Sequence, residues 1–248
     1  MKVTFLHHSS FLVELPSHIF LFDYFQGDRV NGYHFSGALP ELDKEKPFYV
    51  FASHKHQDHF DMDNLHLADC YPKVQFVFSK DCKMTKNFLK KHGFSEAVQS
   101  RITYVGADKE YHLDDICVRT LMSTDAGVAF CVEAEGKNIY HAGDLNWWYW
   151  EGAGDLVNGR TERGFKRAMR RIADTHFHLA FVPLDPRMGK DSFKGFGYFL
   201  QNVDADHVFP MHMWQDYSLI RAYKGRTDND YFLSRIEEVE KENQEFLF

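Results

Sequence analysis

Short apolar segments separated by turn residues dominate the chain and predict a protein rich in β-strands. Continuous apolar runs such as Phe48–Ser53 are typical of buried strands, which lack the alternation of half-exposed ones. The turn at Pro16–Ser17 and the hairpin-like segment 133–137 separate neighbouring strands. Strands are expected over 3–7, 11–15, 18–23, 48–53, 74–78, 102–105, 116–121, 128–133, 138–141, 180–184 and 207–211.

Helical spacing appears between these strands and toward the end of the chain. In residues 80–92, Met84, Phe88 and Leu89 share one face, and Gly93 provides a stop. Further helices are expected over 164–173, 191–203 and 231–245. Strands mixed with helices in this order predict two packed β-sheets flanked by helices, in a single domain spanning residues 1–248. Residues 24–47 hold three glycines and two prolines among polar residues and predict a long loop, of the kind that is usually functional or disordered.

Charge and composition exclude several classes of protein. Lys and Arg number 29 against 36 Asp and Glu, so the net charge of −7 argues against a general binder of nucleic acid. A local run of six basic residues within 160–171 is the one candidate polyanion contact, although such runs are more often solvated helix faces. The N-terminus lacks an uninterrupted apolar core, and no segment has about 18 consecutive apolar residues. We therefore expect a cytoplasmic protein without membrane contact, whose four scattered cysteines are reduced.

Three of the 15 histidines lie with an aspartate directly after a predicted buried strand. In the sequence HKHQDH, His54 and His56 are two residues apart and can point the same way in an extended turn. Asp58 and His59 can then face a neighbouring point, so one loop offers ligands to two metal ions. Imidazole is a common ligand of such ions. The alternative is a solvated, histidine-rich loop.

Two later strand ends carry the same residue types. Asp144 follows the strand ending at His141, with Gly143 permitting a sharp turn, and His212 follows the strand ending at Met211. Each alone could be an ordinary turn residue. Together with the 54–59 cluster they indicate a metal site assembled from three strand ends.

The order HxHxDH, Gly-Asp and late strand-end His resembles the metallo-β-lactamase superfamily over nearly the whole chain. The segments HSSFLVE at 8–14 and PMH at 210–212 look like the branch that contains the ascorbate-6-phosphate lactonases. The resemblance implies a four-layer αββα sandwich with mixed sheets. It also implies two divalent ions, with His54 and His56 on the first, Asp58, His59 and His212 on the second, and Asp144 bridging them.

Asp125 marks a departure from that pattern. The family usually supplies a third histidine to the first metal from this region, and here the sequence has Ser-Thr-Asp-Ala-Gly at 123–127. Asp125 either ligates the first metal, which would shift preference from Zn²⁺ toward Mn²⁺ or Fe²⁺, or the first metal is held weakly. We favour Asp125 as a ligand.

Several residues near the predicted ligands are candidates for catalysis or substrate contact. Asp58 can accept a hydrogen bond from the attacking water, and His141, Asp185 and His8 are candidates for orientation or proton transfer. All four tryptophans follow predicted ligands closely, which suggests an aromatic wall, although some are expected only to pack the scaffold. The predicted substrate contacts are His8, Trp147, Trp148, Arg187 and Trp214, and Arg187 could instead pair with a structural aspartate.

The expected activity is hydrolysis of a small-molecule ester, lactone or phosphoester by a metal-bound hydroxide. The alternatives are a phosphodiesterase or nuclease, and a metal-binding sensor without efficient turnover. A di-iron oxidoreductase is disfavoured because its relatives carry Glu where His56 stands. The sequence leaves the substrate, the metal and self-association into a homo-oligomer open.

The Asp125 hypothesis predicts the number of bound metals. After stripping and separate reconstitution with Mn²⁺ and Zn²⁺, elemental analysis should find two ions per wild-type chain. Asp125→Ala should lose the first ion, because a carboxylate oxygen is removed from it. Two tightly bound ions in Asp125→Ala would contradict the hypothesis.

Overall fold

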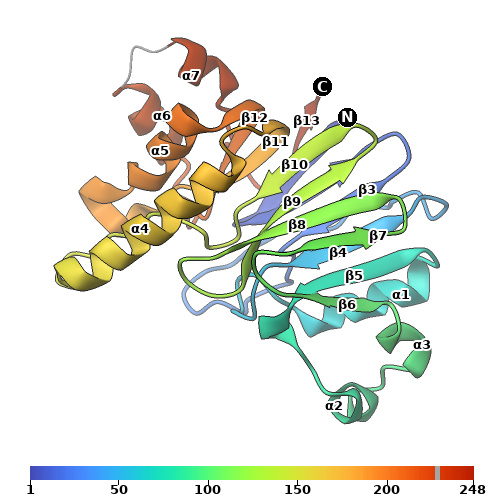
Figure 1. Ribbon diagram of the computed structural model, residues 1–248. Helices are drawn as coiled ribbons and strands as arrows, with labels where there is room; N and C mark the ends of the chain where they lie inside the picture. Colours follow the sequence, from blue (N-terminus) through green and yellow to red (C-terminus); the bar gives the residue numbers. More distant parts are fainter. Residues whose placement is uncertain (227–229) are drawn as a thin grey trace. The chain divides into compact units, whose positions relative to one another are not determined.

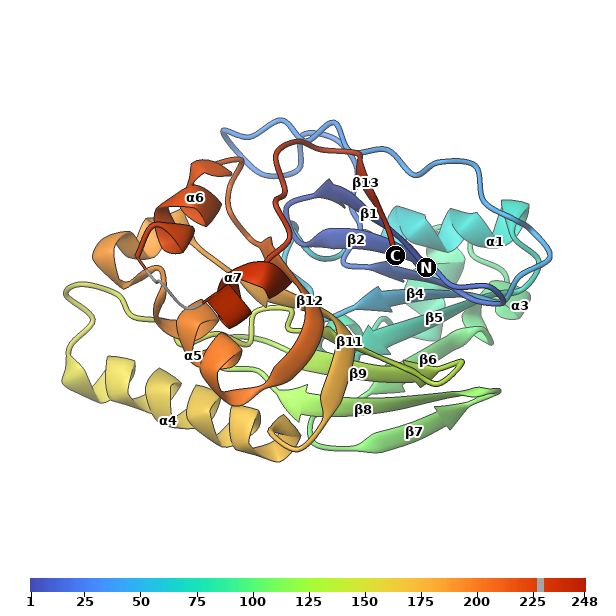
Figure 2. The same ribbon diagram turned by 90° about the horizontal axis from the view of Figure 1, so that it is seen from above.

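The computed structural model describes residues 1–226 and 230–248 and divides into two compact units. Unit 1 comprises residues 1–106 and 242–248, and unit 2 comprises residues 107–241. Each unit contains one mixed β-sheet with helices, so the predicted architecture of two mixed sheets flanked by helices is confirmed (Figures 1 and 2). Whether the units form the single predicted domain stays a prediction.

Unit 1 is built on a seven-stranded sheet with the order β13-β1-β2-β3-β4-β5-β6. The first strands pair antiparallel, whereas β3 to β6 run parallel, as expected of almost fully apolar strands. Its strands are β1 (Lys2–His7), β2 (Ser10–Glu14), β3 (Ile19–Phe22), β4 (Phe48–Ala52), β5 (Val74–Ser79), β6 (Ile102–Val105) and β13 (Gln244–Leu247).

Short helices cover one face of the unit 1 sheet. Leu65, Leu89 and Phe94 from these helices and their connections are buried in one apolar cluster with residues of β3, β4 and β5. The cluster gives each short helix the tertiary packing that helices of this length need for stability. The helices are η1 (Met62–His66), α1 (Leu67–Cys70), η2 (Lys80–Cys82), α2 (Lys86–Lys91) and α3 (Glu96–Gln99).

Unit 2 has a six-stranded sheet with the order β12-β11-β10-β9-β8-β7. Its β7 to β10 form an antiparallel meander, and β10, β11 and β12 are parallel. The strands are β7 (Glu110–Leu113), β8 (Ile116–Met122), β9 (Val128–Ala134), β10 (Lys137–His141), β11 (His176–Pro183) and β12 (Asp204–Met211).

The unit 2 helices gather beside β11 and β12 (Figure 2). They are α4 (Asp155–Ile172), η3 (Pro186–Asp191), α5 (Lys194–Asn202), α6 (Ser218–Lys224) and α7 (Asp230–Arg235). Helix α4 buries Phe165, Met169 and Ile172, while its basic residues are mostly exposed or paired, as in the Lys166–Glu162 and Arg171–Asp108 ion pairs. This is the solvated-face pattern. No described helix is both long and apolar enough to span a membrane.

The expected terminal helix over 231–245 is wrong. Helix α7 ends at Arg235, and residues 244–247 form β13 on the edge of β1. Helix-favouring residues such as Glu245 are overridden by a free strand edge, and Lys2 binds both Glu14 and Glu245 across the three strands. The sequence also missed β7 and placed the start of α4 too late, while the helix expected over 80–92 is regular only over 86–91.

The predicted loop over 24–47 has no helix or strand but is anchored at several points. Phe25 and Phe35 are buried against the ring of His7, and Ser36 and Ala38 donate backbone hydrogen bonds to Glu242 and Asn243. Burial lowers the pKa of His7 to about 4, so this histidine is a neutral core residue.

Gly37 brings this loop close against β1, which yields a stability prediction. A Cβ there would lie 2.3 Å from His7 Cδ2 and 2.4 Å from Leu6 O. Gly37→Ala should therefore lower the free energy of unfolding by about 1–3 kcal/mol. Urea denaturation measures this, with Gly106→Ala as the control because its nearest contact would be an ordinary 3.5 Å. Equal stability of the two variants would contradict the prediction.

Candidate metal centre

In unit 1, the loop after β4 brings two of the predicted ligands of the first metal together. The backbone N–H groups of His59 and Phe60 both donate to His56 O, which closes a tight turn. Within it, His54 Nε2 lies 2.9 Å from His56 Nδ1, with the two rings edge to face. The predicted convergence of His54 and His56 is therefore present in the structure.

Asp23, at the end of β3, holds this loop in place and was missed by the sequence analysis. Its carboxylate accepts from Ser53 N at 2.7 Å and from Ser53 Oγ at 2.6 Å, and it lies 2.8 Å from His59 Nδ1. Asp23 is fully buried and has a φ of +45°, a conformation that costs energy outside glycine. Its signal in the sequence was a lone aspartate after the apolar strand Ile19–Phe22, like Asp144 after β10.

His8 joins the predicted ligands of the second metal within unit 1. Its Nε2 lies 3.3 Å from Asp58 Oδ2, and His59 Nε2 lies 3.7 Å from the same oxygen. Ligand atoms of His8, Asp58 and His59 all lie within 4.8 Å of one another. The sequence suggested substrate contact or proton transfer for His8, and the structure adds a position suited to metal ligation.

In unit 2, Asp144 and His212 come from the ends of β10 and β12. His212 Nε2 lies 3.4 Å from Asp144 Oδ1, and ligand atoms of Asp125 and Asp144 lie within 4.8 Å of each other. Gly143 and His212 both have positive φ, of 51° and 62°. The chain thus turns sharply at each strand end to present its ligand.

Buried Asp185 supports His212 from the other side. Its Oδ2 lies 2.9 Å from His212 Nδ1, and it accepts three hydrogen bonds from the Arg187 guanidinium. Burial opposes ionisation of Asp185, but the hydrogen bonds from His212 and Arg187 outweigh it and lower its pKa to about 2. Asp185 is therefore an ionised carboxylate at neutral pH. Its pairing with Arg187 matches the alternative in which Arg187 binds a structural aspartate instead of a substrate.

These contacts test whether the residues suit divalent metals. His59 and His212 each direct Nδ1 at a buried carboxylate, which fixes the tautomer that leaves Nε2 with a lone pair. Each Nε2 then faces an aspartate oxygen at 3.7 or 3.4 Å. Two ligands of one tetrahedral ion are separated by about 3.4 Å. The donor sets of both units fit divalent ions with nitrogen and oxygen ligands.

The three tryptophans predicted to contact the substrate divide into two groups. Trp148 and Trp214 each lie edge-on to the His212 ring, and Arg187 lies 4.4 Å over the Trp214 ring. Trp147 instead packs against Tyr198 with Lys166 and Lys194 over its ring. Trp148 and Trp214 thus lie beside a predicted ligand, and Trp147 faces α4 and α5.

Close packing and local hydrogen bonds determine the conformation of the loop after Asp144. Trp148 Nε1 donates to Asp144 O at 2.9 Å, and His141 Nδ1 accepts from Gly143 N at 3.2 Å. At Gly195 on α5, a Cβ would lie 1.8 Å from Asn146 Oδ1, so only glycine permits this approach. His141 therefore contacts the turn before Asp144, and its catalytic role stays a prediction.

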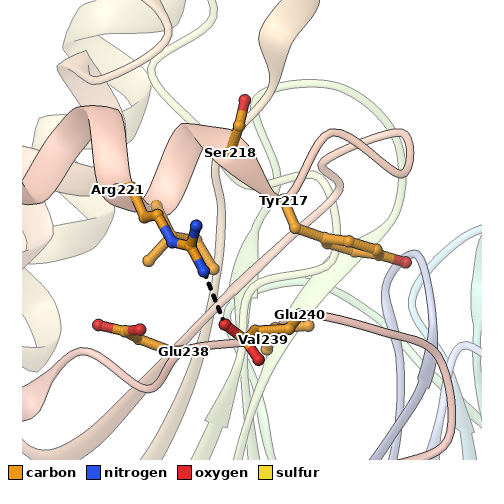
Figure 3. A pocket seen from close by; sticks show the side chains of 7 residues that line it. Tyr217, Ser218, Arg221, Glu238, Val239 and Glu240 are labelled. Atoms are coloured by element: carbon orange, nitrogen blue, oxygen red, sulfur yellow. Dashed lines mark hydrogen bonds and ion pairs between the residues drawn. The ribbon is translucent and has the colours of Figure 1, made fainter.

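A small pocket between α6 and residues 238–240 in unit 2 holds none of the predicted site residues. Its walls include Tyr217, Arg221 and Glu240, and the Arg221–Glu240 ion pair at 2.9 Å crosses it (Figure 3). Exposed ion pairs of this kind contribute little stability, and the pocket has no donor set for a metal.

Comparison with known proteins gives the class. Residues 2–148 match the family described as a beta-lactamase superfamily domain, and the chain belongs to that superfamily. It is a metal-dependent hydrolase of the metallo-β-lactamase superfamily.

Solved structures share its fold at low sequence identity. Igni18, a metallo hydrolase from the archaeon Ignicoccus hospitalis, has a TM-score of 0.64 at 18% identity over 100% of this chain and 98% of its own. A possible metal-dependent hydrolase from Veillonella parvula has a TM-score of 0.60 at 14% identity, over 99% and 98% of the two chains. An isothiocyanate hydrolase from Delia radicum gut bacteria has 0.59 at 16% identity, over 100% and 99%.

The contacts of Asp23 predict a role in metal affinity. Asp23→Asn removes the charge that fixes His59 and Ser53, so affinity for Zn²⁺ or Mn²⁺ should fall about 10–100-fold. Competition with a chromophoric chelator measures the affinity. Asp69→Asn is the control, because Asp69 is exposed and contacts only His66 among the interactions described. Unchanged affinity in Asp23→Asn would contradict the supporting role.

Proposed function

We propose that the chain hydrolyses a small-molecule ester, lactone or phosphoester with two divalent ions, Zn²⁺ or Mn²⁺ and less favourably Fe²⁺. The observation that carries the proposal is the paired arrangement of His59 and His212, each with Nδ1 on a buried carboxylate and Nε2 toward an aspartate. Such carboxylate–histidine pairs are the usual support of metal-binding imidazoles.

The ligand assignment follows the sequence pattern. His54, His56 and Asp125 would hold the first ion, Asp58, His59 and His212 the second, and Asp144 would bridge them. When bound, two such ions supply Lewis acidity and lower the pKa of water toward about 7. The contacts of His8 with Asp58 make His8 a further candidate ligand or proton carrier.

The chain's own residues would orient the reactants. Asp58 would accept a hydrogen bond from the attacking water while it ligates, and its Oδ2 lies beside both His8 and His59. Asp185 keeps the His212 ring in place, and the positive charge of Arg187 balances the negative charge of Asp185. Trp214 is half-buried and offers apolar ring surface next to His212 for a flat substrate group, whereas the buried ring of Trp148 stacks on Trp150.

The substrate class within this proposal rests on the sequence resemblance. A lactone of the sugar-phosphate type follows only from the resemblance to the ascorbate-6-phosphate lactonase branch. A phosphodiesterase or nuclease is less favoured, since two of the basic residues on α4 already have ion-pair partners. Cytoplasmic location, a small-molecule partner and self-association stay predictions.

A substrate panel with Mn²⁺ present tests the proposal. We expect turnover of lactones and none of a bis-aryl phosphodiester. Asp58→Asn should lower kcat/KM about 10²–10⁴-fold, because it removes the carboxylate charge assigned to the second ion and to the attacking water. Asp63→Asn, an exposed change in the same region, should leave it unchanged. Turnover of the phosphodiester alone would favour the nuclease, and full metal loading without any turnover would favour the sensor.

A further inference from the structure

The outward face of the β7–β8 hairpin carries a second group of metal-binding residue types. Glu110 and His112 on β7 are exposed, and Cys117 on β8 is half-buried, while their neighbours Ile116 and Val118 are buried. The alternation of the two strands thus places an imidazole, a thiol and a carboxylate on one face.

Strand pairing brings these three side chains together. The strands are joined by the two-residue turn at 114–115, and His112 pairs directly with Cys117. Directly paired residues have Cβ atoms about 4.5–5.5 Å apart. Glu110 lies two residues from His112, and its Oε1 is 3.2 Å from His112 Nε2. Ligand atoms of Glu110, His112 and Cys117 all lie within 4.8 Å of one another.

The surroundings of Cys117 favour a cation. Glu133 on β9 pairs with Cys117, so carboxylates stand on both neighbouring strands. Burial and the charges of Glu110 and Glu133 raise the pKa of the thiol, with Arg119 opposing them. A divalent ion would neutralise the carboxylates and stabilise the thiolate, since the thiolate is the form that binds metal. The side chains line an open hollow and are accessible from solvent.

We propose that Glu110, His112 and Cys117 form an accessory site for a borderline-soft divalent cation, Zn²⁺ being the best match. Mixed sulfur, nitrogen and oxygen ligands are typical of zinc, whereas Mg²⁺ and Mn²⁺ prefer oxygen. Water or Glu133 would occupy the fourth coordination position of the ion. The site lies on the exposed face of the β7–β8 hairpin, where a bound ion would join β7 to β8. Figure 1 shows this hairpin at the edge of the unit 2 sheet.

This site differs chemically from the proposed catalytic centre, and a Zn²⁺ bound here would add to the two ions assigned to that centre. The ligands assigned to that centre are histidines and aspartates only, so a thiolate ligand identifies the accessory site. Bound Co²⁺, a spectroscopic substitute for Zn²⁺, gives a thiolate-to-cobalt charge-transfer absorption only when a cysteine ligates it.

The test is a Co²⁺ titration of the full chain in the metal-free, reduced form. We expect the thiolate-to-cobalt absorption in the wild type, its loss in Cys117→Ser, and its decline when Zn²⁺ is added. Cys70→Ser is the matched control, because Cys70 is an exposed cysteine of unit 1. His112→Gln and Glu110→Gln should each raise the half-saturating Co²⁺ concentration at least about tenfold.

Three results would overturn the proposal: no thiolate absorption in the wild type, absorption that persists in Cys117→Ser, or half-saturation unchanged in both His112→Gln and Glu110→Gln. Circular dichroism checks that each variant folds. Because the readout is a thiolate signal, it is independent of turnover and of the fate of the proposed function.

Discussion

The hydrogen bond between a buried carboxylate and the Nδ1 of a histidine is the interaction on which the candidate centre depends. Asp23 makes it with His59 in unit 1, and Asp185 makes it with His212 in unit 2. In each case the bond fixes one tautomer and one ring orientation, so that Nε2 is directed at an aspartate. Without it, a histidine at a strand end could rotate away from the position that metal binding requires.

Burying a carboxylate costs solvation free energy, and the fold offsets this cost in two ways. Asp23 accepts hydrogen bonds from the backbone and hydroxyl of Ser53 as well as contacting His59. Asp185 is paired with the Arg187 guanidinium, which also lies over the Trp214 ring. These partners replace the lost hydration of both carboxylates, and the partners of Asp185 keep that group ionised.

Strand ends explain why the functional residues are dispersed in sequence. In each unit, neighbouring parallel strands end at the same edge of the sheet: β3 and β4 in unit 1, and β10, β11 and β12 in unit 2. Asp23 and His54 follow the first pair, and Asp144, Asp185 and His212 follow the second set. Positive φ at Asp23, Gly143 and His212 turns the chain at these points. Glycine adopts this conformation freely, whereas at Asp23 and His212 it is strained, and such strain is typical of functional sites.

Most strands, the class of the fold and the residues of the HxHxDH loop could be predicted from the amino-acid sequence alone. Apolar runs and strand-end histidines are local signals, and local pattern is sufficient to detect them. The roles of Asp23 and His8, the packing of Trp147 and the strand β13 in place of the expected terminal helix became visible only in the folded chain. These depend on partners distant in the chain: Asp23 needs Ser53 and His59, and β13 needs the free edge of β1. The pattern of residues within one segment contains no information about partners from another part of the chain.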